Sequence, residues 1–315
     1  MYALPRDAIW LRTGDPRILA LADRLWDRAQ AGRRVGRRAG VPMDFAIEVL
    51  LGGDGVPAEE LLAERWSIGT GDAELSVGDH LRARIDWVGA RLDGRVSAGL
   101  VAQHPSLVAR LLLETPAALL LARRGYGVVH AGAIAGPAGA VVVRGAAGAG
   151  KSTLVAAAHR SGLGVLGDET VLVARSDPDE LLSAVRDVTL LPDAAHLLGL
   201  EDAVTVARAG TEAKLRLDLS SSSTPAVRRA RRVATVLLGS RNGGAARLEP
   251  LAPATFLEQF RQGEIPQERW SGTPAHIAAN WSRSGAYRLS GAADLTGAVA
   301  LLTDLTNRPL AARPA

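Results

Sequence analysis

The hydrophobic pattern changes character about 125 residues into the chain. Before that point, apolar residues recur at helical spacing over residues 17–29, and apolar and polar residues alternate as in half-buried strands over 74–77 and 82–88. From Pro105 to Arg124 the pattern is helical again, with Pro116 expected to break the helix. Residues 1–125 are therefore predicted to form a small α+β domain.

A denser run of β-forming residues begins at Gly127. Gly127–Ala135 and the short apolar strand Ala140–Arg144 flank the turn sequence Gly136-Pro137-Ala138-Gly139, which predicts an antiparallel hairpin. A helix is expected from Lys151 to Arg160, ended by Gly162. Further strands are expected over 163–166, 170–175, 184–190, 214–219 and 233–238, and helices over 192–198, 253–260, 274–281 and 294–305. Residues 126–315 are therefore predicted to form an α/β domain.

The composition is that of a globular protein. Hydrophobic residues make up 47% of the chain and charged residues 22%, which excludes a disordered chain. The absence of cysteine excludes disulfides, thiolate metal sites and a thiol nucleophile. Charge and proline interrupt the N-terminus at once, unlike a secretory signal, and the apolar stretch 111–122 is too short to span a bilayer. We expect a cytoplasmic protein with no membrane partner, and a homo-oligomer remains open.

The charged residues are mostly arginine. The formal net charge of +4 suggests nucleic acid, but the cations are spread along the chain, and aromatic residues for base stacking make up only 4% of it. The balance disfavours nucleic acid and suits an acidic peptide or phosphate-rich ligand equally well. Among 37 Lys and Arg residues only Lys151 and Lys214 are lysines, so each is a candidate for a role that needs a compact ammonium group.

One short segment carries the most specific chemical signal. Gly145-Ala146-Ala147-Gly148-Ala149-Gly150-Lys151-Ser152 matches the Walker A motif G-x-x-x-x-G-K-[ST] at every position. Its glycines let backbone N–H groups turn toward phosphate oxygens, and the following helix points its positive end at the same anion. Lys151 can reach the β- and γ-phosphates, and the Ser152 hydroxyl can ligate Mg²⁺. The loop, extended to Thr153 in the first helical turn, is therefore predicted to bind ATP and Mg²⁺.

Two carboxylates follow this loop after one helix and one short strand. Asp168 and Glu169 are expected at the carboxyl end of that strand, where α/β sheets present ligand-binding groups. Phosphoryl transfer needs a carboxylate for the metal and a base for the acceptor's proton. His130 is expected within the strand before the hairpin, beside the strand of the loop, where an imidazole could orient or tune the base.

Together these segments resemble a known family. Val129–Ile134, Val141–Ser152 and Gly162–Val173 are similar in order and spacing to the catalytic domain of HPr kinase/phosphorylase. They are more similar still to the HPr-kinase-like proteins of peptide natural-product clusters of the lasso-peptide type. The similarity is strong over about residues 128–175 and weaker to about 220. Two departures are that HPr kinases carry two aspartates where this chain has Asp168-Glu169, and that their downstream signature loop is not found.

The resemblance implies both a fold and an activity. The implied fold over residues 126–315 is a phosphoenolpyruvate-carboxykinase-like P-loop domain with a mixed sheet. The implied activity is ATP-dependent phosphorylation of a Ser or Thr hydroxyl in a peptide or protein, such as a natural-product precursor peptide. Residues 1–125 are then candidates for recognising that acceptor.

The resemblance also implies roles for single residues. Asp168 would be the general base, with His130 beside it and Lys151 on the phosphates. Ser152 and Glu169 would hold the metal. Two downstream cations are carried over as candidates to neutralise charge in the transition state, namely Lys214 and Arg216.

Other readings remain open. A small-molecule kinase could share the same core and differ only in its acceptor site. A module that binds ATP without transferring phosphate is a third hypothesis, although such a sensor need not keep a base at Asp168. A transport-type ATPase is disfavoured because its acidic strand normally lies further from the loop and no Leu-Ser-Gly-Gly signature occurs.

Overall fold

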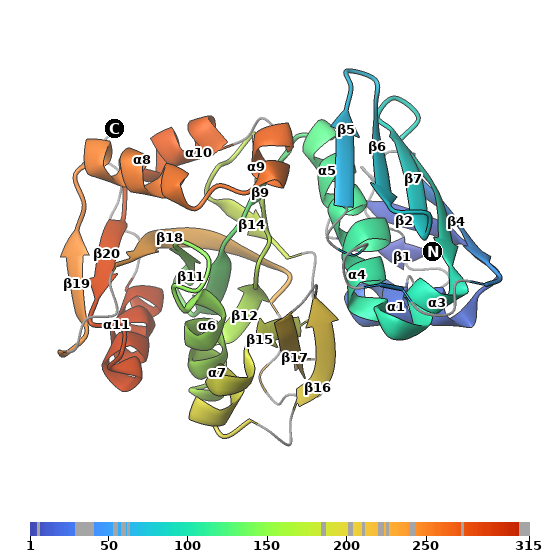
Figure 1. Ribbon diagram of the computed structural model, residues 1–315. Helices are drawn as coiled ribbons and strands as arrows, with labels where there is room; N and C mark the ends of the chain where they lie inside the picture. The colour runs from blue at the N-terminus through green and yellow to red at the C-terminus, as the bar shows by residue number, and fades with distance from the viewer. Residues whose placement is uncertain are drawn as a thin grey trace. The chain divides into compact units, whose positions relative to one another are not determined.

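A computed structural model of the chain divides into two compact units (Figure 1). One comprises Met1–Arg124 with Thr205–Leu215, and the other Gly125–Val204 with Arg216–Ala315. The structure describes residues 1–4, 7–28, 41–52, 56–57, 61, 64–183, 187–200, 204–209, 212–219, 224, 227–239, 244–271 and 274–308. Each unit is described by itself.

The first unit is built on an eight-stranded sheet of order β3-β1-β2-β4-β8-β7-β6-β5. Strands β2, β4 and β8 run parallel to one another, and the remaining pairs are antiparallel. The strands are β1 (Tyr2–Ala3), β2 (Ala8–Arg12), β3 (Asp27–Arg28), β4 (Met43–Leu50), β5 (Glu64–Ile68), β6 (Asp72–Val77), β7 (Leu81–Asp86) and β8 (Arg91–Ser97). Buried and exposed residues alternate along β7 and β8, so one face of the sheet is packed and the other faces solvent.

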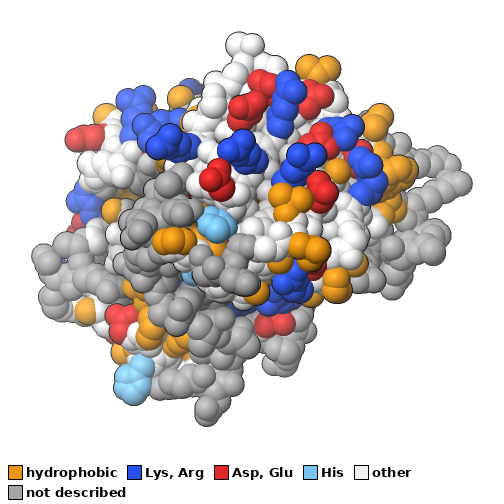
Figure 2. All heavy atoms as spheres, turned by 45° about the vertical axis from the view of Figure 1, so that its right-hand side comes forward, with side chains coloured by type: hydrophobic (Ala, Val, Ile, Leu, Met, Phe, Trp, Pro, Cys, Tyr) orange, Lys and Arg blue, Asp and Glu red, His pale blue; other side chains and the backbone are white. Residues whose placement is uncertain are grey.

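The solvent face of this sheet forms a shallow groove of about 1530 Å³. Arginines and carboxylates alternate along it, including Arg84, Arg95, Glu48 and Asp93. Several of these arginines are ion-paired, as in the contact of Arg95 Nε with Glu48 Oε2 at 3.1 Å. On the face drawn in Figure 2, basic and acidic side chains of the described residues are likewise interspersed rather than gathered into a single basic patch.

The helices of the first unit include one long, buried run. They are α1 (Pro16–Leu25), α3 (Ala98–Gln103), α4 (Pro105–Ala109), the π-helical turn η1 (Arg110–Glu114) and α5 (Thr115–Arg123). Pro116 does not break this run as expected. A proline ring clashes with the carbonyl four residues earlier, but the chain widens into η1 just before it, where the Thr115 N–H bonds to the Arg110 carbonyl.

The run Pro105–Arg123 is also long and apolar enough to cross a membrane by length and composition. However, 78% of its most apolar window is buried inside the structure, as in a core helix. The packing therefore accounts for its apolar character without a bilayer.

The second unit contains a mixed nine-stranded sheet. Its main path is β12-β10-β11-β18-β14-β13-β9, and β20 pairs with β18 and β19 beside it. The strands are β9 (Tyr126–Val129), β10 (Gly132–Gly136), β11 (Gly139–Arg144), β12 (Gly164–Gly167), β13 (Val171–Ala174), β14 (Glu180–Leu182), β18 (Arg229–Leu238), β19 (Arg247–Pro250) and β20 (Ala286–Ser290). Strand β11 pairs antiparallel with β10 and parallel with β18. Outside this sheet, β15 (Asp187–Leu190) pairs with β17 (Glu212–Asp218). The part of β17 up to Leu215 and nearly all of β16 (Val204–Ala209) belong to the segment grouped with the first unit.

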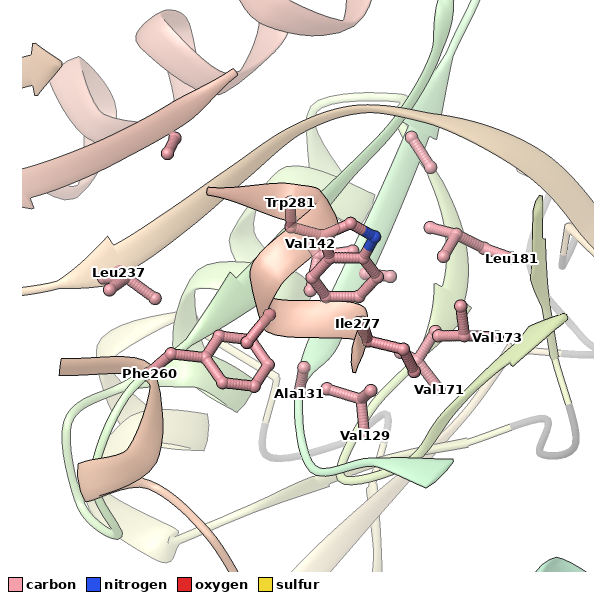
Figure 3. Packing of buried hydrophobic residues seen from close by; sticks show 14 of the residues in the cluster. Val129, Ala131, Val142, Val171, Val173, Leu181, Leu237, Phe260, Ile277 and Trp281 are labelled. Carbon is pink, nitrogen blue, oxygen red and sulfur yellow. The ribbon is translucent and has the colours of Figure 1, made fainter. Parts of the chain in front are cut away.

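Helices cover both faces of the nine-stranded sheet (Figure 1). On one face lie α6 (Lys151–Arg160) and α11 (Leu295–Asn307), and on the other α8 (Pro253–Gln262), α9 (Pro266–Ser271) and α10 (Pro274–Trp281). A short helix, α7 (Pro192–Leu197), follows β15. In the core under α8 and α10, the rings of Phe260 and Trp281 pack with valines of β9, β11 and β13 (Figure 3).

The local predictions for the second unit are largely confirmed. The hairpin β10–β11 closes with Gly136 opposite Gly139, and α6 spans the residues expected. Of the strand expected at 184–190, Asp187–Leu190 forms β15, and residues 184–186 lie outside the described part of the chain. One prediction is wrong, because His130 does not lie within a strand. The β-rich run 127–135 is interrupted there, so that β9 pairs with β13 whereas β10 pairs with β11 and β12.

Candidate functional site

The Walker A loop leaves the carboxyl end of β11 and enters α6. Gly148 and Gly150 have φ angles of 74° and 98°, in the left-handed region that other residues rarely adopt. Gly150 is the residue that caps the N-terminus of α6. Helix N-termini carry partial positive charge and present backbone N–H groups to anions. The strand, the turned loop and the helix thus have the arrangement that a phosphate site requires.

The side chains predicted to touch phosphate or metal lie at this helix start. Lys151 is 8% exposed, and its ammonium donates to the carbonyls of Gly145 at 2.9 Å and Ala146 at 3.1 Å. Burial lowers the pKa of Lys151, and the charges of Asp168 and Glu169 oppose that shift. Ser152 and Thr153 are half-buried in the first turn of α6, whereas Ala146, Ala147 and Gly148 are exposed and Ala149 is half-buried.

Asp168 joins this helix to the end of β12. Its Oδ1 accepts from the Ser152 hydroxyl at 3.0 Å, and its Oδ2 accepts from the Thr189 backbone N–H at 3.0 Å. The side chain is 5% exposed. Burial raises the pKa of Asp168 to about 7, helped by the charge of Glu169, while the two hydrogen bonds work against the rise. A buried carboxyl with a pKa near neutrality can exchange a proton at physiological pH.

The His130 ring contacts the backbone carbonyl of Glu169. Glu169 has a φ of 64°, an uncommon left-handed conformation for a residue with a side chain. Its carbonyl lies 2.7 Å from His130 Nδ1. Because a carbonyl only accepts, the His130 proton must sit on Nδ1, which fixes the tautomer. Burial, followed by the nearby charge of Lys151, lowers the pKa of His130, so the ring is neutral at pH 7 and holds the acidic turn as a donor.

The structure places the two downstream cations differently. Arg216 on β17 forms an ion pair with Asp187, with Nε and Oδ2 2.6 Å apart. Asp187 is close enough to Asp168 for its charge to raise the pKa of that carboxyl. Arg216 is therefore linked to the site through one carboxylate. Lys214 belongs to the segment grouped with the first unit, so it is not placed relative to the loop.

Thr189 and Asp187 were not found from the sequence. Both lie on β15, about twenty residues after the acidic pair, in a short strand without a charged or glycine-rich motif of its own. Thr189 contributes only its backbone N–H, which any residue except proline could supply. No residue-type signal could have indicated that contact.

A divalent metal here would depend on the nucleotide. Among the described residues, no group of three or more His, Cys, Asp or Glu side chains is arranged to hold a metal ion. Ser152, Asp168 and Glu169 offer hard oxygen donors, which suit Mg²⁺. Since Mg²⁺ is usually bound by one or two protein groups together with phosphates and water, this set fits a metal that arrives with a triphosphate.

The raised pKa of Asp168 predicts how stability depends on pH without nucleotide or metal. Below about pH 4 the carboxyl is neutral in both the folded and unfolded states, but between about pH 4 and 7 only the folded state keeps the proton. The free energy of unfolding of the wild type therefore falls from about pH 4 upward, and the loss is complete once the pH has risen through about 7. We expect Asp168→Asn to gain free energy of unfolding over the wild type by up to about 4 kcal/mol between about pH 4 and 8, measured by urea denaturation. A difference that stays constant with pH would contradict the shift.

A second prediction uses two glycines near opposite ends of α6. Gly148 and Gly162 have φ angles of 74° and 93°, and a Cβ at either would meet no atom within 4 Å. Alanine at either position should cost about 1–2 kcal/mol because both backbones are left-handed. Only Gly148→Ala should also weaken ATP binding, measured by calorimetry, since its methyl group would stand where phosphate approaches. Equal effects of both variants on binding would contradict the loop assignment.

Comparison with known proteins adds little to this geometry. No protein-family model and no curated protein matches the chain. Among solved structures, the Hpr(Ser) kinase/phosphatase from Coxiella burnetii aligns over 39% of this chain and 77% of its own, with 18% identity and a TM-score of 0.24. A TM-score this low does not show a common fold. The candidate function therefore rests on the site itself, in which a Walker A loop, a buried carboxyl and a neutral histidine lie together in a mixed α/β unit.

Proposed function

We propose that this protein is an ATP- and Mg²⁺-dependent kinase that phosphorylates a Ser or Thr hydroxyl of a peptide or protein in the cytoplasm. One observation carries the proposal: the buried carboxyl of Asp168 accepts a hydrogen bond from Ser152 of the Walker A motif at 3.0 Å. Its burial raises the pKa of Asp168 to about 7. A base works best when its pKa lies near the working pH. A site that only held ATP would not need such a group.

Each side chain then has a role in positioning or proton transfer. Lys151 would turn from the Gly145 and Ala146 carbonyls to the β- and γ-phosphates, and the loop N–H groups would hold their oxygens. Asp168 would take the proton of the acceptor hydroxyl, with His130 orienting the turn that carries it. Ser152 and Glu169 would hold Mg²⁺, which supplies neutralisation of phosphate charge when it is bound.

The sheet supports a more specific fold within this proposal. In common P-loop ATPases the strand of the loop lies among parallel strands, whereas here β11 pairs with β10 in an antiparallel hairpin. We infer a phosphoenolpyruvate-carboxykinase-like domain, as the sequence resemblance implies. Arg216, linked to Asp168 through Asp187, is the better placed candidate to neutralise transition-state charge, and Lys214 remains a proposal from sequence alone.

The first unit is our candidate for acceptor recognition. Its sheet carries a groove lined with both arginines and carboxylates, which offers a peptide many polar partners. A precursor peptide of a natural product is one acceptor of this kind. A small-molecule kinase with the same core, or an ATP-sensing module, are the competing functions.

The proposal is tested by incubating the purified protein with γ-labelled ATP and Mg²⁺ and, in separate reactions, a library of Ser- and Thr-containing peptides or a pool of hydroxyl-bearing metabolites. Label on a peptide hydroxyl supports the kinase. Label only on a metabolite supports the small-molecule alternative. Tight ATP binding with no labelled acceptor in either pool supports the sensor and contradicts the kinase.

A further inference from the structure

A fully buried ion pair lies directly behind the Walker A loop. Arg144 is the last residue of β11, immediately before the loop, and Glu268 lies on α9; they are 1% and 0% exposed. The guanidinium and the carboxylate meet in a bidentate contact, with Nη2 and Oε2 3.1 Å apart. Neither side chain has a role in the phosphate and metal site proposed so far. The pair brings α9 against the start of the loop, although the two are more than a hundred residues apart in sequence.

This pair holds the backbone of His130 at both of its polar groups. Glu268 Oε1 accepts from the His130 N–H at 2.7 Å, and Arg144 Nη1 donates to the His130 carbonyl at 3.1 Å. Two further hydrogen bonds reach α8 and the residue before α9, from Arg144 Nε to the Phe260 carbonyl at 2.8 Å and from the Ile265 N–H to Glu268 Oε2 at 3.0 Å. The pair thus fixes the break between β9 and β10 at which His130 sits.

Through His130 the pair reaches the acidic turn. His130 Nδ1 donates to the Glu169 carbonyl, and Asp168 in the same turn bonds to Ser152 on α6. Arg144 is also bonded directly to Gly145, the first residue of the loop. The pair therefore supports the phosphate side and the base side of the site at once.

Stability alone is a weak reason for such a pair. Buried ion pairs are often no more stabilising than apolar side chains of similar volume, because both charges lose their hydration. The second unit offers a direct comparison in Arg232 and Asp179, which are 1% and 5% exposed and bonded at 2.8 Å. Arg232 lies over the ring of Trp281 at 5.3 Å, as Arg144 lies over Phe260 at 4.0 Å, and these two rings pack together (Figure 3).

The two pairs differ in what they hold. Strand β11 pairs with β18 so that Arg144 faces Leu237 while Ala140 faces Arg232, which places the pairs near opposite ends of β11. Arg232 donates to Asp179, to the Ser284 hydroxyl and carbonyl and to the Thr235 hydroxyl. It is therefore a matched buried pair at the end of β11 away from the phosphate loop.

We propose that Arg144 and Glu268 are positioning residues that set the geometry of the phosphate loop and of the His130–Glu169 contact. This inference rests on the proposed function, because it assigns the pair a part in phosphoryl transfer. It predicts that weakening the pair loosens the loop and the His130 segment together. Misplacing reacting groups by about 1 Å costs on the order of a hundredfold in rate, so turnover should fall while the unit remains folded.

Glu268→Gln tests this with Asp179→Asn as its control. A glutamine amide donates where one carboxylate oxygen accepts, so Arg144 and either the His130 or the Ile265 N–H would face another donor. We expect hydrogen exchange of segments 127–135 and 144–152 to accelerate about tenfold, as for the loss of one charged hydrogen bond, and kcat to fall about tenfold to a hundredfold with a smaller change in KM for ATP. Asp179→Asn should lower the melting temperature but leave both quantities within about twofold of wild type.

Arg144→Lys provides a second variant if glutamine prevents folding, with Arg232→Lys as its control. Lysine keeps the charge but cannot serve the carboxylate and the two backbone carbonyls together. Equal effects at both pairs, or unchanged exchange and kcat at the Arg144 pair, would overturn the inference. If wild type transfers no phosphate, the proposed function fails, while the exchange comparison still decides whether the pair positions the loop.

Discussion

Replacement of Asp168 by asparagine is expected to lower the rate of phosphoryl transfer by about 10²–10⁴-fold while ATP binding stays close to that of wild type. Asparagine preserves the shape of the side chain and can still accept one of the hydrogen bonds from Ser152 and Thr189. It cannot take a proton from the acceptor. Initial rates with γ-labelled ATP, together with calorimetric ATP binding, measure both effects.

A companion variant decides between the two carboxylates. Glu169→Gln should raise the Mg²⁺ concentration needed for half-maximal rate more than it lowers the rate at saturating Mg²⁺, since Glu169 is proposed to hold the metal. Undiminished transfer by Asp168→Asn, with loss of transfer in Glu169→Gln, would reverse the two roles. Misfolding is excluded as a cause if Asp168→Asn is at least as stable as wild type above about pH 7, as its raised pKa requires.

Removal of the Lys151 ammonium is expected to have the next largest effect, a loss of about 10²–10³-fold in kcat/KM for ATP. Lys151→Ala deletes a buried donor that faces two loop carbonyls and would otherwise contact the phosphates. Lys151→Arg should also fail, because the planar guanidinium is larger and the residue is only 8% exposed. Nearly all other cations of the chain are arginines, so Lys151→Arg tests whether this position specifically requires lysine.

Arg160 at the other end of α6 is the control for Lys151. It is exposed, and Arg160→Lys should leave ATP binding and transfer unchanged. Steady-state kinetics with varied ATP separate the effects on kcat and KM. Full activity of Lys151→Arg would mean that any positive charge suffices and that the loop does not close tightly around the lysine.

Much of the candidate site could be predicted because its signals are local. The hairpin, the Walker A motif and the helix follow one another directly in the sequence between Gly132 and Arg160. Two glycines of the motif, Gly148 and Gly150, have the left-handed φ angles that such a loop needs. The contact of Asp168 with Ser152 spans sixteen residues and one helix. In contrast, Glu268 reaches the site from 124 residues beyond Arg144, and no local spacing can indicate such a contact.

The rest of the fold depended on pairing and packing that the local pattern does not record. Propensity placed His130 inside a continuous strand, but β9 and β10 choose different partners, so the chain breaks there. Pro116 was expected to end a helix, and the π-helical turn before it relieves the clash instead. In the first unit, parallel pairing of β2, β4 and β8 joins segments far apart in sequence.

The central claim is tested most directly by following the γ-phosphoryl group of ATP. Wild-type protein with Mg²⁺, γ-labelled ATP and the peptide library is quenched and analysed by mass spectrometry for the labelled atom. We predict an acid-stable phosphoester on a Ser or Thr hydroxyl, formed by wild type and not by Asp168→Asn. Recovery of ATP intact despite saturated binding, or of label only as inorganic phosphate, would contradict the account.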